Sequence, residues 1–202
     1  MDTGTDERRS KARVRDALKS AQYLVAFYIN KKTFPVKEIV NRVANSKLVT
    51  FDLEAIYPEG ERIAFDISQW LLEGIVLRES EFREQAKEHD WSQYQDKYVA
   101  LFCSTDAIVP GWAYLLLSLH LAPFAKKVTV GSLAQLESLL FAEILQNIDI
   151  SEYRDKPVII KGCAHKPIPQ NAYVLLAQKL QPVAKSIMYG EACSSVPLFK
   201  RK

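Results

Sequence analysis

The feature that most constrains how this chain can fold is an internal repeat. Residues 92–131 align with residues 151–190 without a gap, and fifteen of the forty aligned positions are identical. Two unrelated segments of this length would share roughly two or three identities, so we interpret the match as an internal duplication. Each copy begins with the pattern Ser-x-Tyr-x-Asp-Lys and carries a proline in its middle, at Pro110 and Pro169.

Each copy contains an apolar run of strand length, and its proline then opens a helix. The pattern predicts strands at 98–102, 127–130, 158–161 and 186–189, and helices that begin at Pro110, Ser132 and Pro169. Short buried strands that alternate with helices are typical of a parallel sheet with right-handed crossovers. We therefore predict an α/β fold, a doubly wound parallel sheet of four strands built from an internal αβαβ duplication.

A duplicated unit favours the strand order 2-1-3-4, with the first strand of each copy side by side. Such a sheet binds ligands in the crevice outside the carboxyl ends of its two central strands. On this prediction, the strands at 98–102 and 158–161 are neighbours and their following loops line the crevice.

The chain divides into three predicted segments. Residues 1–35 are expected to be an extension, partly disordered or a loosely packed helix. Residues 36–80 form a small N-terminal β-containing segment packed on the main domain, with strands at 48–53 and 62–65. Residues 81–200 form the duplicated α/β domain.

Composition excludes several classes of function. The net charge of +3 is small and the basic residues form no long block, which argues against nucleic acid as a partner. The apolar run from Tyr23 to Ile29 is too short to span a bilayer, so no membrane association is expected. No secretory leader opens the chain, and we expect a cytoplasmic protein with reduced thiols.

Three cysteines are predicted to meet at one edge of the sheet. Cys103 and Cys163 follow the two central strands, and Cys193 follows the last one. His165 lies two residues after Cys163, and Asp106 occupies the matching loop of the first copy, where it can support a site or cap the following helix. Thiolates select soft or borderline metals, so Cys103, Cys163, Cys193 and His165 predict a site for zinc or an iron–sulfur cluster.

Other interpretations of the same residues stay open. Free cysteine is often simply a small buried side chain, which would leave a non-catalytic interaction module with structural cysteines. Cys103 with His165 also suggests a small enzyme with a cysteine nucleophile that acts on an anionic ligand at the switch point. Nucleotide binding is disfavoured, because no Gly-x-Gly-x-x-Gly or Gly-Lys-Ser/Thr motif is present.

Several segments resemble a family of uncharacterised bacterial proteins, domain of unknown function number 2480. They are Val40–Leu53, Cys103–Pro110, Trp112–Tyr114, Lys161–Cys163 and Val183–Leu198. The resemblance covers about residues 38–200 and implies no mechanism. It associates the chain with gene neighbourhoods for iron–sulfur cluster assembly, which implies iron–sulfur assembly proteins as partners and an accessory role in that process.

Overall fold

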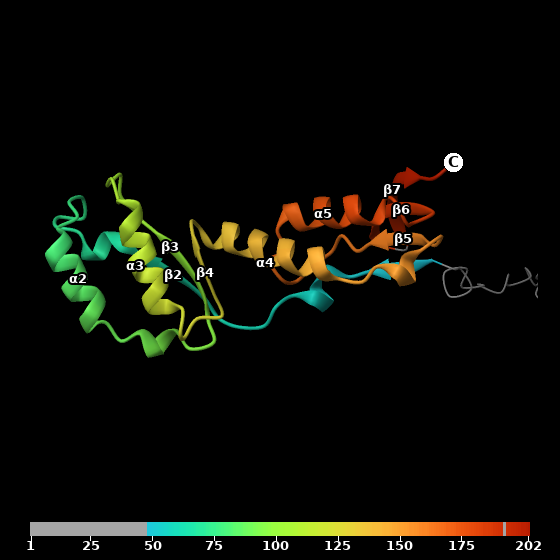
Figure 1. Ribbon diagram of the computed structural model, residues 1–202. Helices are drawn as coiled ribbons and strands as arrows, with labels where there is room; N and C mark the ends of the chain where they lie inside the picture. Colours follow the sequence, from blue (N-terminus) through green and yellow to red (C-terminus); the bar gives the residue numbers. More distant parts are fainter. Residues whose placement is uncertain (1–47, 192) are drawn as a thin grey trace, which may run out of the picture. The chain divides into compact units, whose positions relative to one another are not determined.

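The described residues, 48–191 and 193–202 of the computed structural model, form a mixed α/β fold with four α-helices and two sheets (Figure 1). The helices are α2 (Glu79–Glu88), α3 (Gly111–Leu121), α4 (Leu133–Asn147) and α5 (Gln170–Leu180). The strands are β1 (Val49–Phe51), β2 (Arg62–Asp66), β3 (Tyr98–Phe102), β4 (Lys127–Val130), β5 (Pro157–Ile160), β6 (Ser186–Glu191) and β7 (Ser194–Lys200). Four 3₁₀ turns complete this part of the chain: η1 (Leu53–Ile56), η2 (Ile67–Trp70), η3 (Trp91–Tyr94) and η4 (Ser151–Tyr153). The prediction for residues 1–35 lies outside the described residues.

The strands fall into two separate sheets, so the predicted single four-stranded parallel sheet is wrong. One sheet has three parallel strands in the order β2-β3-β4. The other has the order β1-β5-β6-β7, in which the first three strands are parallel and β7 is antiparallel. The two strands predicted to be central neighbours are β3 and β5, which lie in different sheets. The predicted order and its switch-point crevice are therefore wrong as well.

The physical reason lies in the segment before the repeat. This segment supplies one edge strand to each sheet: β2 pairs with β3, and β1 pairs with β5. The two registers match, because Phe65 lies opposite Leu101 in one sheet and Phe51 lies opposite Ile160 in the other. Each central strand thereby gains two parallel neighbours, and neither needs the other as a partner.

Helices cover each sheet with apolar side chains that recur at helical spacing. On the three-stranded sheet, Val99 and Leu101 of β3 pack in a core with residues from α2 and α3. On the four-stranded sheet, Val158 and Ile160 of β5 pack with residues from α4 and α5. Leu117 of α3 and Leu176 of α5, which occupy equivalent positions in the repeat, are fully buried as predicted.

Helix α4 contributes to the packing of both sheets. Leu136 and Leu140 contact Ala100 on the face of β3 opposite to α3. Phe141 and Leu145, further along the helix, belong to the core of the four-stranded sheet. The predicted start of this helix at Ser132 is confirmed: Ser132 and Gln135 cap it with a reciprocal pair of hydrogen bonds.

The sequence prediction missed β7. This strand runs antiparallel along β6 and forms an edge of its sheet, with an irregularity between Ile187 and Met188. Pro197 lies within it, and proline is tolerated in a strand mainly at such an edge, where its missing N–H removes no ladder hydrogen bond. None of the helices in the described ranges has the length and apolar character that a membrane span requires.

Candidate functional site

The predicted cysteine site assumed that the three cysteines follow strands of a single sheet, whereas the structure places these strands in two sheets. Cys103 follows β3 of the three-stranded sheet, where it is half-buried and its Sγ lies 3.3 Å from Thr105 Oγ1. Cys163 and Cys193 are exposed and belong to loops of the four-stranded sheet. Among residues 48–191 and 193–202, no group of three or more His, Cys, Asp or Glu side chains is placed to hold a metal ion. The zinc or iron–sulfur site therefore stays a prediction from the sequence.

The two supporting residues have roles other than those expected. Asp106 is exposed, and α3 has Pro110 at its N-cap without a side-chain capping bond, so the predicted cap by Asp106 is not formed. His165 is exposed and contributes its backbone amide rather than its imidazole to the nearest polar cluster.

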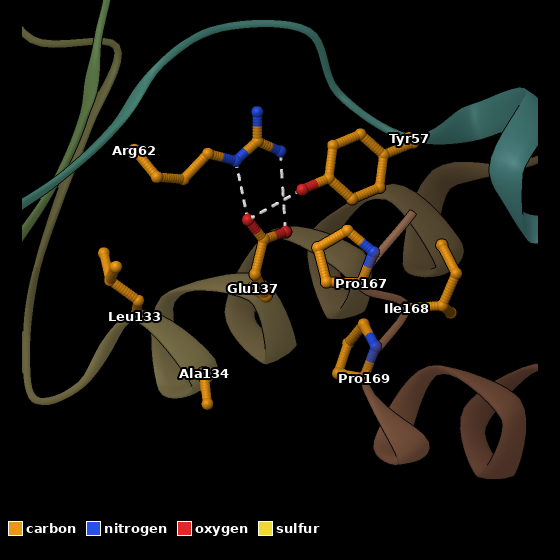
Figure 2. A pocket seen from close by; sticks show the side chains of 8 residues that line it. All are labelled: Tyr57, Arg62, Leu133, Ala134, Glu137, Pro167, Ile168 and Pro169. Carbon is orange, nitrogen blue, oxygen red and sulfur yellow. Dashed lines mark hydrogen bonds and ion pairs between the residues drawn. The ribbon is translucent and has the colours of Figure 1, made fainter. Parts of the chain in front are cut away.

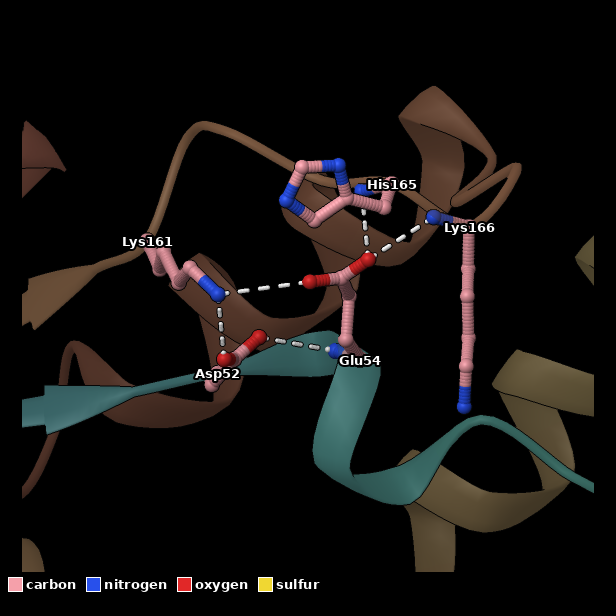
Figure 3. Close-up of polar contacts among 5 residues, drawn as sticks. All are labelled: Asp52, Glu54, Lys161, His165 and Lys166. Carbon is pink, nitrogen blue, oxygen red and sulfur yellow. Dashed lines mark hydrogen bonds and ion pairs between the residues drawn. The ribbon is translucent and has the colours of Figure 1, made fainter.

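That cluster lies at the carboxyl ends of β1 and β5 and is centred on Glu54 (Figure 3). We call it the Glu54 cluster. The Glu54 carboxylate accepts hydrogen bonds from the backbone amides of His165 and Lys166, the latter at 2.7 Å. Lys161 donates to Asp52 at 2.6 Å and to Glu54 at 3.3 Å. These contacts tether the loop between β5 and α5, residues 161–169, to the turn that follows β1.

The charges of this cluster stabilise one another. The amide of Lys166, together with that of His165 and the Lys161 ammonium, lowers the pKa of Glu54 although partial burial acts in the opposite direction. Hydrogen bonds to Asp52 and then to Glu54 raise the pKa of Lys161. The Glu54 carboxylate and the Lys161 ammonium are therefore both ionised at neutral pH. A lysine held protonated between two carboxylates fits the role of a tether and not that of a nucleophile.

A pocket of about 530 Å³ lies beside this loop (Figure 2). Its wall combines three parts of the chain: the first turns of α4, the 161–169 loop, and the connection between β1 and β2 together with the first residue of β2. The lining residues are Tyr57, Arg62, Leu133, Ala134, Glu137, Pro167, Ile168 and Pro169. Most of these side chains are apolar, and the polar groups are confined to one side.

The polar side of the pocket is a buried ion pair. Glu137 is the one buried charged residue of the described ranges, with 7% of its surface exposed. Arg62 Nε donates to Glu137 Oε1 at 2.6 Å, and the Tyr57 hydroxyl donates to the same oxygen at 3.1 Å. Burial, and then the negative charge of Glu137, raise the pKa of Tyr57, so its hydroxyl stays protonated as a donor.

The pocket and the Glu54 cluster share the 161–169 loop. Lys166 donates its amide to Glu54, and its ammonium lies 5.1 Å from the centre of the Tyr57 ring. The next three residues, Pro167–Pro169, line the pocket. The Glu54 cluster therefore positions one wall of the pocket.

Sequence reasoning did not identify this pocket. Arg62 and Glu137 lie 75 residues apart, and neither belongs to the internal repeat. The available signal was weak: a glutamate between Leu136 and the apolar run Leu139–Phe141, on a helix face that is otherwise buried. A charged residue on such a face needs a buried partner, but the pattern does not say which one.

Comparison with known proteins gives one match. The family model described as "Protein of unknown function (DUF2480)" matches residues 37–201 of the chain. Neither the curated proteins nor the solved structures contain a match to it.

Proposed function

Because the chain belongs to the DUF2480 family, whose description names no activity, we propose a function from the geometry of the pocket: the protein binds a small, largely apolar molecule there. The observation that carries this proposal is a half-open apolar cavity of about 530 Å³ with a buried, hydrogen-bonded Arg62–Glu137 pair on one side. The cavity lies within the range of about 300–1,000 Å³ that is usual for small-molecule sites.

Two features favour ligand binding over a mere packing defect. Polar groups converge on one side of an apolar wall, which is the arrangement that orients a bound molecule. The opposite wall, Pro167–Pro169, is held in place by the Glu54 cluster through the adjoining residue Lys166. Both walls are therefore preorganised, and ordering them costs little free energy when a ligand binds.

The proposal is tested with a simple aromatic probe, 2-naphthalenemethanol, by saturation-transfer NMR on the full chain. We expect binding to the wild-type protein and its loss in Ala134→Trp, which places an indole in the pocket. Ala134 is exposed at the first turn of α4, so the change leaves the core intact. The matched control is Ala122→Trp, an exposed alanine at the end of α3, which should bind the probe like the wild type. Equal binding by the wild type and Ala134→Trp would place the ligand elsewhere and reject the proposal.

We also propose that the two halves of the protein derive from one duplicated unit. Local contacts that recur 59 residues apart support this. The amide of Asp96 donates to Phe124 O, and that of Asp155 donates to Val183 O, both at 2.9 Å. Asp96 and Asp155 also share a rare left-handed backbone, with φ of 60° and 58°. On this proposal only one wall of the pocket, the loop after β5, belongs to a repeated unit, since its other lining residues lie outside the two repeats.

A second candidate function, self-association, is favoured by the surface of α3. Leu115 and Leu119, one turn apart, are 66% and 73% exposed. The helix carries no Asp, Glu, Lys or Arg, so its exposed stripe can meet a second copy of itself without repulsion between like charges. A symmetric contact of this kind would cover an apolar stripe that is otherwise left in water.

Light scattering after size-exclusion chromatography tests the second candidate. The wild type should be a dimer, and Leu119→Lys should be a monomer because it places two like charges in a symmetric contact. Val174→Lys is the matched control, since Val174 is also exposed and lies on α5 at the position equivalent to Leu115. A wild-type protein that is monomeric at every concentration would rule this interface out.

A further inference from the structure

We propose that the ligand of the pocket is an uncharged, largely apolar molecule that carries a hydrogen-bond donor, such as a hydroxyl or an amide N–H, at one end. This inference rests on the proposed function and specifies the chemistry of the same site. It follows from which polar atoms of the pocket already make hydrogen bonds within the protein and which can still make one to a ligand.

Groups of the protein itself already contact the positively charged guanidinium of Arg62. Its Nε donates to Glu137 Oε1 and its Nη1 donates to Gly60 O at 2.5 Å. Its guanidinium also lies over two aromatic rings, 4.4 Å from the centre of the Tyr57 ring and 4.9 Å from that of Tyr98. Two of its nitrogens thus donate within the protein and two aromatic rings lie against the guanidinium, so much of its capacity to attract an anionic ligand is already used.

The ion pair also balances the charge of the pocket wall. The side chains of Arg62 and Glu137 are only 14% and 9% exposed. A charged ligand would have to be desolvated against a neutral pair, or it would have to break that pair and leave one charge buried without a partner. The Lys166 ammonium, 5.1 Å from the centre of the Tyr57 ring, belongs to an exposed residue, so water and salt screen its charge. The wall therefore favours a ligand without net charge.

Two acceptors beside the pocket, one on Glu137 and one on Tyr57, can still receive a hydrogen bond. Glu137 Oε1 receives two donors, whereas in the described ranges Oε2 has only the long contact of 3.5 Å to Arg62 Nη2 (Figure 2). The Tyr57 hydroxyl donates its hydrogen bond to Glu137, and its oxygen keeps lone pairs that can accept one. A ligand that offers a donor can satisfy either atom, while a ligand that offers only acceptors cannot.

Four probes with the same naphthalene body separate these possibilities. They are 2-naphthalenemethanol (an uncharged donor), its methyl ether (uncharged, without a donor), 2-naphthoate (an anion) and 2-naphthylmethylammonium (a cation). Dissociation constants are measured by NMR titration of the full chain, with Ala134→Trp as the variant that blocks the pocket. We expect the alcohol to bind about tenfold more tightly than each of the other three.

The outcomes distinguish this inference from the proposed function. Pocket binding that Ala134→Trp abolishes, but with naphthoate or the ammonium equal to or tighter than the alcohol, would overturn the ligand class and leave the pocket as the binding site. Equal affinities for the alcohol and its methyl ether would overturn the requirement for a donor. If none of the probes binds, the proposed function fails and this inference fails with it.

A conservative variant tests which acceptor atom of the pocket binds the donor of the ligand. Tyr57→Phe keeps the ring beside Arg62 but removes one of the two acceptors, so a decreased preference for the alcohol over its methyl ether identifies the Tyr57 oxygen as the acceptor and a retained preference identifies Glu137. The matched control is Tyr189→Phe, which removes a hydroxyl near Gly162 at the carboxyl edge of the four-stranded sheet and should leave the preference unchanged. An undiminished preference in Tyr57→Phe together with a lowered one in Tyr189→Phe would place the donor-binding group outside the pocket.

Discussion

At the scale of single residues, His89 joins a ring of aromatic side chains beside the three-stranded sheet. Its imidazole lies 4.7 Å from the Trp91 ring and 5.3 Å from that of Trp70, measured between ring centres. Its Nε2 lies 3.0 Å from the Tyr94 hydroxyl and 3.1 Å from the side-chain amide of Gln93. Both groups can donate, so Nε2 is an acceptor in the neutral ring, and protonation would remove that acceptor.

The protein should therefore lose stability as His89 becomes protonated. Burial lowers the pKa of His89, and the nearby Asp90 offsets only part of this effect. The unfolded chain then binds a proton at higher pH than the folded one, so the free energy of unfolding should be highest above about pH 6.5 and should fall as the pH drops below that value. Denaturant unfolding between about pH 7.5 and pH 5 measures the slope. His89→Gln should flatten it and His165→Gln, in an exposed loop, should not; an unchanged slope in His89→Gln would contradict the assignment.

Single residues also explain why the pocket is absent from the sequence prediction. Cysteine and histidine are common metal ligands by residue type, so the sequence pointed to Cys103, Cys163 and His165. Glu137 and Arg62 are ordinary surface residues by type, and only their pairing in the fold makes them distinctive. The sequence contains both residues but not the contact between them.

At the scale of elements, the two helices that follow the central strands are expected to stabilise the fold equally. Leu117→Ala in α3 and Leu176→Ala in α5 should each lower the free energy of unfolding by about 2–5 kcal/mol, because both side chains are fully buried. Val174→Ala is the control: this side chain of α5 is 47% exposed and its truncation should change stability by about 0.5 kcal/mol or less. Urea unfolding checks all three, and a small effect at Leu117 or Leu176 would show that its helix packs loosely.

The Glu54 cluster should control the mobility of the 161–169 loop. Glu54→Ala removes the acceptor of two backbone amides, so hydrogen exchange at His165 and Lys166 should accelerate by about tenfold or more. Glu59→Ala, an exposed glutamate before β2, serves as the control and should leave both amides unchanged. Equal protection of these amides in the wild type and in Glu54→Ala would mean that the carboxylate does not tether the loop.

Local structure was predictable at this scale, but the pairing of elements was not. The strand at 98–102 and the helices opened by Pro110, Ser132 and Pro169 are confirmed because apolar periodicity and capping residues act over a few positions. One of the two partners of β5 is β1, more than one hundred residues earlier, and no local signal encodes that choice. The prediction therefore joined two correct strands, β3 and β5, into the wrong sheet.

At the scale of the whole molecule, α4 links the two cores. Its residues pack against β3 and also into the core of the four-stranded sheet. All three tryptophans, Trp70, Trp91 and Trp112, belong to the core of the three-stranded sheet, so their fluorescence reports on that half alone. Far-ultraviolet circular dichroism reports on both halves.

We expect the two signals to change together during urea unfolding, because loss of one core removes the support for α4 and hence for the other core. Ala142→Gly weakens α4 without truncating a large core side chain, and it should shift both transitions to lower urea by the same amount. A fluorescence transition that precedes or follows the dichroism transition would contradict this coupling.

The pocket beside the 161–169 loop is proposed to bind a small apolar ligand. The most direct test of this proposal is a ¹H–¹⁵N correlation spectrum of the labelled full chain, recorded as 2-naphthalenemethanol is added. We expect saturable shift changes centred on Leu133, Ala134 and Ile168, which come from two different walls of the pocket. Shift changes confined to other surfaces, such as the loop after β3 at residues 103–110, or no changes at all, would contradict the proposal.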